Sequence, residues 1–203
     1  MNRAKIKRHL DALADLDADV NRALEIVRYP APRIRAQGFE TLLSIIVSQQ
    51  ISTAASAAIM KRVRLLLPTM EAGAVLGLAD GALRAAGLSA RKVDYVEELA
   101  RAIIENHFDP DLLGAMDDQS AIAAISSLKG FGVWSAEIYL MFSLRRSDVF
   151  PAGDLALRVA LQKLKGIDEP LSEKQARELA ARWSPYRSAG SLLLWHYYHG
   201  APT

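Results

Sequence analysis

Apolar residues recur at helical spacing along most of this chain, and capping residues or prolines mark where the helices begin and end. Asp17 can cap a helix that reaches about Arg28, after which Pro30 and Pro32 force an extended break. The next stretch, 39–47, is strongly apolar. The first quarter of the chain therefore predicts helices separated by one proline-rich connection.

The same punctuation continues to the end of the chain. Further helices are predicted to begin at capping residues: Ser52 or Thr53, Asp80, Ser89, Asp117, Asp154 and the Ser172–Gln175 capping box. Pro68 and Gly87 end two of them, and Pro185 resets the chain before a last helix over 188–199. No run of alternating polar and apolar residues lies between turn residues, so we expect an all-α protein of about ten helices with short connections.

Composition narrows the class of protein. A chain of 203 residues that is 51% hydrophobic can form one compact domain or two small lobes. It has no cysteine, which excludes disulfides, thiolate-bound zinc, cysteine nucleophiles and iron–sulfur clusters. The net charge of +2 and pI near 8.9 are compatible with a polyanionic partner but are weak evidence for one.

The chain gives no sign of a membrane or export signal. No apolar run approaches the roughly 20 residues that a membrane span needs. The first 16 residues mix charged and apolar positions and lack the apolar centre of a signal peptide. We therefore expect a soluble, cytoplasmic protein with no membrane partner.

The segment Leu128–Gly132 contains the first candidate chemistry. Two glycines flank one apolar residue between helical patterns, and glycine allows positive φ and close approach of a ligand to the backbone. The amides around Gly132 begin the next helix, where exposed N–H groups and the helix dipole favour an anion such as phosphate. Alone, such a segment is more often a plain tight turn. Here a helix of about ten residues and a loop ending in Asp154 follow it.

This arrangement resembles the helix-hairpin-helix, Gly/Pro-rich loop and aspartate of the HhH-GPD superfamily of base-excision DNA glycosylases. It is most similar to the alkylpurine branch, the DNA-3-methyladenine glycosylase II (AlkA-like) enzymes. Segments 46–52, 87–92 and 183–188, with Trp195, agree with that branch. The resemblance covers roughly residues 35–200.

The resemblance implies a fold and a division of the chain. It implies a single HhH-GPD glycosylase domain over residues 1–203, all-helical and two-lobed, with the active-site cleft between the lobes. A central helical lobe is expected over about 45–155, and a second lobe from about 1–44 and 156–203.

Asp154 has two readings. Its position before LALRVALQKL suits a helix N-cap, which is the usual role of such an aspartate. The resemblance implies that it is also the catalytic carboxylate. Cleavage of an N-glycosidic bond develops positive charge on the sugar. A carboxylate about 4 Å away can stabilise that charge by about 4 kcal/mol at an effective dielectric near 20, and both roles can coexist.

Trp134 bears on the type of reaction. Bifunctional relatives have a nucleophilic lysine at the second position after the last hairpin glycine, and Trp134 occupies that position here. Lys129 and Lys163 lie elsewhere in the sequence. The resemblance thus implies a monofunctional enzyme without lyase activity, which releases alkylated purines such as 3-methyladenine or 7-methylguanine and leaves an abasic site.

The resemblance also implies an aromatic base pocket. Alkylated purines carry a positive charge, and an indole face attracts cations. Trp134 is expected on the pocket wall and Trp195 against the extruded base, with Tyr139 as a further candidate. From the residues alone, ordinary core packing explains these aromatic side chains equally well.

The resemblance implies that two short segments contact the DNA. The amides of Gly130 and Gly132, helped by Lys129, are expected to contact phosphate. The wedge that enters the gap left by the flipped base is expected at Gln50, with Gln49 beside it. The AlkA prototype has leucine there, so a glutamine could instead hydrogen-bond the orphaned base. A solvent-facing turn is the alternative reading.

The expected partner is double-stranded DNA containing damaged bases, bound by a monomer. We expect no cofactor and no metal ligands; the family often holds a structural monovalent cation between hairpin carbonyls and a DNA phosphate. His196 and His199 lack a matched third ligand. Two alternatives remain open: a non-enzymatic helix-hairpin-helix DNA-binding protein, and a glycosylase for other damaged or mismatched bases. Many of the latter carry a four-cysteine cluster or the lysine that this chain lacks.

Overall fold

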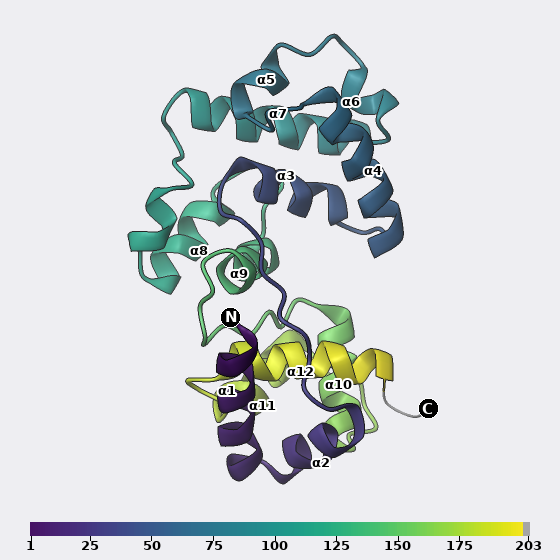
Figure 1. The fold of residues 1–203 in the computed structure, drawn as a ribbon, viewed down its shortest axis with the longest axis vertical. Helices are drawn as coiled ribbons and strands as arrows, with labels where there is room; N and C mark the ends of the chain where they lie inside the picture. Colours follow the sequence, from purple (N-terminus) through teal and green to yellow (C-terminus); the bar gives the residue numbers. More distant parts are fainter. Residues whose placement is uncertain (201–203) are drawn as a thin grey trace. The chain divides into compact units, whose positions relative to one another are not determined.

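The structure, a computed structural model, describes residues 1–200, and every regular element in that range is a helix (Figure 1). The all-α prediction is confirmed. In chain order the elements are α1 (Arg3–Leu16), α2 (Ala18–Val27), α3 (Phe39–Ser48), α4 (Thr53–Leu66), α5 (Ala72–Leu76), α6 (Ala82–Ala85), α7 (Ala90–Ile104), the 3₁₀ helix η1 (Leu112–Ala115), α8 (Asp118–Ser126), α9 (Val133–Phe142), α10 (Leu155–Lys165), α11 (Glu173–Ala181) and α12 (Arg187–Gly200). None of the described helices is long and apolar enough to cross a lipid bilayer.

The chain divides into two compact units. Unit 1 comprises Met1–Ile34 and Leu140–Thr203, and unit 2 comprises Arg35–Tyr139. The sequence placed these boundaries near residues 44 and 155. The difference arises because α3 packs on α4 and α7, which draws the whole helix into unit 2. At the second boundary unit 1 resumes at Leu140, so Asp154 belongs to unit 1.

Unit 2 is built around α3. Its residues Leu42, Leu43, Ile45, Ile46 and Val47 are all fully buried, so the helix is apolar on nearly every side. Helices α4 and α7 pack against α3, and α5 covers α7 (Figure 1). The end of α3 is joined to the segment between α8 and α9 within the same unit, by a hydrogen bond from Gln49 to the carbonyl of Gly130.

Unit 1 is built around α12. Residues 188–195 are buried without interruption, and the helix contacts α1, α2 and α10 (Figure 1). Gly190 permits this packing because a Cβ there would lie 2.6 Å from the ring of Trp183. Unit 1 thus brings the two ends of the sequence together around one central helix.

A buried carboxylate joins these distant parts of unit 1. Asp17 caps α2 and is only 2% exposed. It accepts hydrogen bonds from Lys165 Nζ at 2.7 and 2.8 Å and from Trp183 Nε1 at 2.8 Å, and it pairs with Arg182. Burial alone would raise the pKa of the Asp17 carboxyl. The hydrogen bonds from Lys165, Trp183 and Arg182 outweigh burial and hold that pKa well below its usual range.

Most helix starts lie where capping residues predicted them. Ser52, Asp117 and Ser172 accept hydrogen bonds from the first turns of their helices, and the Ser172–Gln175 capping box is present. The cap at Asp80 is wrong, because α6 begins after Gly81, whose φ of +80° makes the turn without a side-chain bond. The sequence reading did not identify α1, although Ile6, Leu10 and Leu13 form a buried stripe, nor the five-residue α5.

The Asp17 network leads to a test of stability. Asp17→Asn should lower the free energy of unfolding by about 3 kcal/mol, because Lys165 and Arg182 lose a buried anionic partner. Asp19 still pairs with Lys165 at 2.7 Å, which limits the loss. Since the folded state lowers the pKa of Asp17, its contribution is complete at neutral pH and is lost as the pH falls below about 4. Urea denaturation at pH 7 and pH 3 should therefore separate the two proteins at pH 7 and bring them closer at pH 3.

Candidate functional site

The turn after α3 presents a glutamine at its tip. Gln50 is exposed and has φ +56°, a left-handed conformation that costs a non-glycine residue about 1–3 kcal/mol. Such a conformation persists only where neighbouring groups hold it. The structure therefore places the predicted wedge residue on a constrained, outward-facing turn.

Hydrogen bonds from two side chains connect this turn to the rest of unit 2. The half-buried Gln49 donates from Nε2 to the carbonyl of Gly130 at 2.8 Å. Lys92, in the first turn of α7, donates from Nζ to the carbonyls of Val47 and Gln49, both at 2.7 Å. These carbonyls lie at the end of α3, where intrahelical partners are lacking. Burial lowers the pKa of the Lys92 ammonium. Gln49 thus has its amide engaged within unit 2, unlike Gln50 at the tip.

The first hairpin glycine is required by the fold itself. Gly130 has φ +88°, and a Cβ at this position would lie 2.3 Å from ring atoms of Tyr95 on α7. Both the backbone angle and the packing exclude a side chain. Phe131, the next residue, donates its N–H to the carbonyl of Leu128 at 3.1 Å and closes the turn.

The second hairpin glycine is not required in this way. Gly132 is exposed, and a Cβ there would meet no atom within 4 Å. It directly precedes α9, whose first N–H groups have no intrahelical acceptor. Lys129 is exposed on the same turn. The arrangement offers backbone donors, a helix N-terminus and a cation, with open space for an anion to approach.

Asp154 lies at the start of α10 in unit 1. Its Oδ1 accepts the N–H of Leu157 at 3.0 Å, so it caps the helix as the sequence predicted. The same oxygen accepts a second hydrogen bond, from Trp195 Nε1 at 3.1 Å. Two donors from different helices therefore fix the orientation of this half-buried carboxylate.

Trp195 places an aromatic ring beside that carboxylate. It is 6% exposed, and its ring lies 5.7 Å from the ring of Phe142, tilted by 34°. The guanidinium of Arg33 lies over the indole at 5.7 Å from its centroid. Arg33 is itself exposed and belongs to the non-helical connection after α2. A planar cation therefore already rests on the tryptophan that the sequence assigned to the flipped base.

The other two aromatic candidates lie in unit 2. Trp134 is half-buried in the first turn of α9, two residues after Gly132. Tyr139 is fully buried, and its hydroxyl accepts the N–H of Gly38 at 2.8 Å. Tyr139 therefore joins α9 to the start of α3 within the core of unit 2, and its place in a base pocket stays a prediction. The predicted cleft between the lobes stays a prediction.

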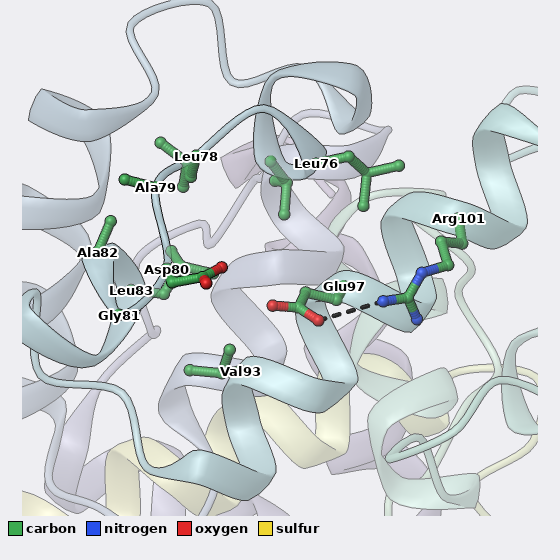
Figure 2. Close-up of a pocket in the computed structure, with 11 residues that line it drawn as sticks. Leu76, Leu78, Ala79, Asp80, Gly81, Ala82, Leu83, Val93, Glu97 and Arg101 are labelled. Carbon is green, nitrogen blue, oxygen red and sulfur yellow. Dashed lines mark hydrogen bonds and ion pairs between the residues drawn. The ribbon is translucent and has the colours of Figure 1, made fainter.

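A separate hollow of about 240 Å³ lies in unit 2 between α5, α6 and α7. Figure 2 shows Asp80 and Glu97 among its lining residues, with Glu97 paired to Arg101 at 3.2 Å. None of the residues predicted from sequence to act on DNA lines it.

Neither His196 nor any other described residue belongs to a cluster suited to a metal ion. His196 is bound to the backbone carbonyl of Val27 at 2.7 Å. Within residues 1–200 no group of three or more His, Asp or Glu side chains is arranged to hold a metal ion.

Sequence reasoning missed three contacts that shape these sites. They are the Trp195–Asp154 hydrogen bond, the Arg33–Trp195 stacking and the Lys92 bonds to the end of α3. Each joins residues at least 41 positions apart, so no local spacing could have indicated them. The half-buried Lys92 follows a predicted helix cap, which is a signal for the helix but not for its partner.

Comparison with known proteins shows the family of the chain. The family model for HhH-GPD superfamily base excision DNA repair proteins matches residues 43–185. The chain is 28% identical over 192 residues to DNA-3-methyladenine glycosylase 1 of Schizosaccharomyces pombe, covering 90% of this chain and 83% of that protein.

Solved structures show the same similarity. The S. pombe 3-methyladenine DNA glycosylase Mag1 in complex with abasic DNA superposes with a TM-score of 0.88 at 26% identity, covering 97% of this chain and 98% of that one. A DNA-3-methyladenine glycosidase from Bacillus halodurans superposes with a TM-score of 0.79 at 30% identity, covering 94% and 88%. The fold of unit 1 and unit 2 is thus that of helical glycosylases.

The two hairpin glycines should respond differently to alanine. Gly130→Ala should destabilise the protein by about 2 kcal/mol or more, because it combines positive φ with a clash against Tyr95. Gly132→Ala should change stability by no more than about 0.5 kcal/mol, since the space around it is open. Thermal unfolding of both variants measures this directly, and equal losses would contradict the assignment of separate roles.

Proposed function

The chain belongs to the HhH-GPD superfamily of base excision DNA repair proteins, and we propose that it is a monofunctional DNA glycosylase that releases alkylated purines. The observation that carries the proposal is the carboxylate of Asp154, held at the head of α10 by Leu157 and Trp195. The relatives named as 3-methyladenine glycosylases, one of them bound to abasic DNA, support the substrate class and the product.

The role of Asp154 follows from charge. As the bond from C1′ to the purine nitrogen breaks, its electron pair leaves with the base and positive charge develops on the sugar. A carboxylate about 4 Å away stabilises that charge by about 4 kcal/mol at an effective dielectric near 20. This corresponds to roughly a thousandfold in rate. Because two hydrogen bonds orient Asp154 beforehand, little reorganisation is needed during the reaction.

Water is the proposed nucleophile. The second position after Gly132 is Trp134, which has no amine to form a Schiff base with the sugar. Water therefore adds its oxygen to C1′ and passes a proton to the carboxylate of Asp154, which orients the water and then releases the proton to solvent. A cationic purine becomes neutral as it leaves, so it needs no protonation by a general acid. The product is an abasic site in an intact strand.

The tryptophans are proposed to recognise the base. Arg33 stacks on Trp195 at 5.7 Å, which indicates that this indole face accepts a flat, delocalised cation. A 3-methyladenine or 7-methylguanine base has the same chemical character. Trp134 is proposed as a second wall of the pocket, in keeping with its half-buried position in α9.

The hairpin and the turn after α3 are proposed to hold the DNA. The amides at Gly132 and the start of α9, with Lys129 nearby, suit a backbone phosphate. The exposed Gln50 is the proposed wedge, which occupies the gap or hydrogen-bonds the orphaned base once the lesion leaves the stack.

Base release without strand cleavage tests the reaction type. Incubation of the protein with methylated duplex DNA should release 3-methyladenine or 7-methylguanine, detected by mass spectrometry. The strand should break only after heat or alkali. Direct nicking, or a covalent adduct trapped by borohydride, would show that an amine attacks the sugar and that the monofunctional assignment is wrong.

Asp154→Asn tests the catalyst. Asparagine caps helices as well as aspartate, so the variant should fold and bind DNA normally. Without the charge, the single-turnover rate of base release should fall by about a thousandfold. Asp168→Asn, which also removes one carboxylate from unit 1, serves as the charge control and should retain the rate. Unchanged release by Asp154→Asn would overturn the proposed role.

A further inference from the structure

The turn that carries Gln50 is tied to two other parts of unit 2. The amide of Gln49 reaches across to Gly130 in the hairpin at 2.8 Å. The ammonium of Lys92 reaches from α7 to the carbonyls of Val47 and Gln49, each at 2.7 Å. Three segments that are far apart in the sequence, at residues 47–49, 92 and 130, therefore meet at one small hydrogen-bonded junction.

The acceptors of all three hydrogen bonds are backbone carbonyls. Lys92 binds the last carbonyls of α3, where a cation also complements the negative end of the helix dipole. Gln49 is half-buried, and its neighbour Gln50 is exposed in a left-handed conformation. The junction therefore supplies the external support that a strained tip residue needs.

We propose that Gln49 and Lys92 are positioning residues that hold the Gln50 turn in a set relation to the hairpin at Gly130. The inference rests on the function proposed above, in which the hairpin binds a phosphate and Gln50 enters the helical gap. A wedge residue can enter the gap only when it lies at the correct distance from the site that binds the DNA backbone. The junction provides that distance through side chains that need not touch the DNA.

A purely structural role makes a different prediction. If Lys92 and Gln49 only stabilised unit 2, their loss would lower stability and weaken binding to every DNA alike. If they position the wedge, their loss reduces recognition of a gap in the base stack and leaves binding to intact duplex nearly unchanged. The ratio of the two affinities separates the alternatives, and it does not depend on catalysis.

The experiment compares Lys92→Met and Gln49→Met with the wild-type chain. Methionine keeps the length of glutamine and all but the last atom of the lysine side chain, and it removes the donor. Affinity is measured for a duplex with one tetrahydrofuran abasic-site analogue and for the same duplex without it. We expect each variant to lose about tenfold of the wild-type preference for the abasic duplex, with intact-duplex affinity changed by less than about twofold.

Two further variants serve as controls. Arg91→Met removes one positive charge from the same turn of α7, at an exposed position, and should retain the preference. Lys92→Arg can still donate to two carbonyls and should recover most of it. Thermal unfolding verifies that each protein is folded, and if Lys92→Met does not fold, Gln49→Met decides the question.

The outcomes are distinct. A wild-type chain without preference for the abasic duplex would refute the proposed function, and this inference with it. A wild-type preference that both methionine variants retain within about twofold would overturn the positioning role alone. A preference lost in both variants and kept in Arg91→Met supports it.

Discussion

The ends of helices carry amides and carbonyls without intrahelical partners, and the proposed site of this chain is built from side chains that bind those groups. Asp154 caps α10 and Asp17 caps α2. Lys92 binds the last carbonyls of α3. The hairpin glycines lead into the N-terminus of α9. Several of the polar contacts described above therefore lie at helix ends.

Asp154 combines a helix cap with the catalytic role proposed above. The bond from the Leu157 amide stabilises the start of α10, and the bond from Trp195 fixes the same oxygen from a second helix. The contacts that start the helix and pack it against α12 thus also fix the orientation of the carboxylate, and an oriented carboxylate is what the proposed stabilisation of a developing cation needs.

Unit 1 depends on a comparable bond at larger sequence separation. Asp17 lies 148 residues before Lys165 and 166 before Trp183, yet all three meet in the interior. A buried anion requires partners of this kind, since desolvation without them is costly. The network therefore joins the start of α2 to the end of α10, the helix that Asp154 caps, and to the segment after α11.

Local sequence signals predicted much of the secondary structure of this protein. Capping residues and apolar periodicity predicted the all-α class and most helix starts, because a cap acts within three or four residues of itself. The Gly-x-Gly hairpin, Trp134 and Asp154 were visible as a motif for the same reason. Where local signals were ambiguous, as at Asp80 and Gly81, the reading failed, since either residue can begin a short helix and backbone conformation decided between them.

Only the tertiary structure decided which side chains meet. It placed Tyr139 in the core on the amide of Gly38, and it joined Trp195 to Asp154 and Gln49 to Gly130. These contacts depend on how helices pack, and packing is decided by the fit between the surfaces of two helices, not by residues adjacent in the sequence. The sequence by itself determined which groups can do chemistry in this chain. The fold determined which of them are held in place to do it, because a hydrogen bond across tens of residues exists only once the helices have packed.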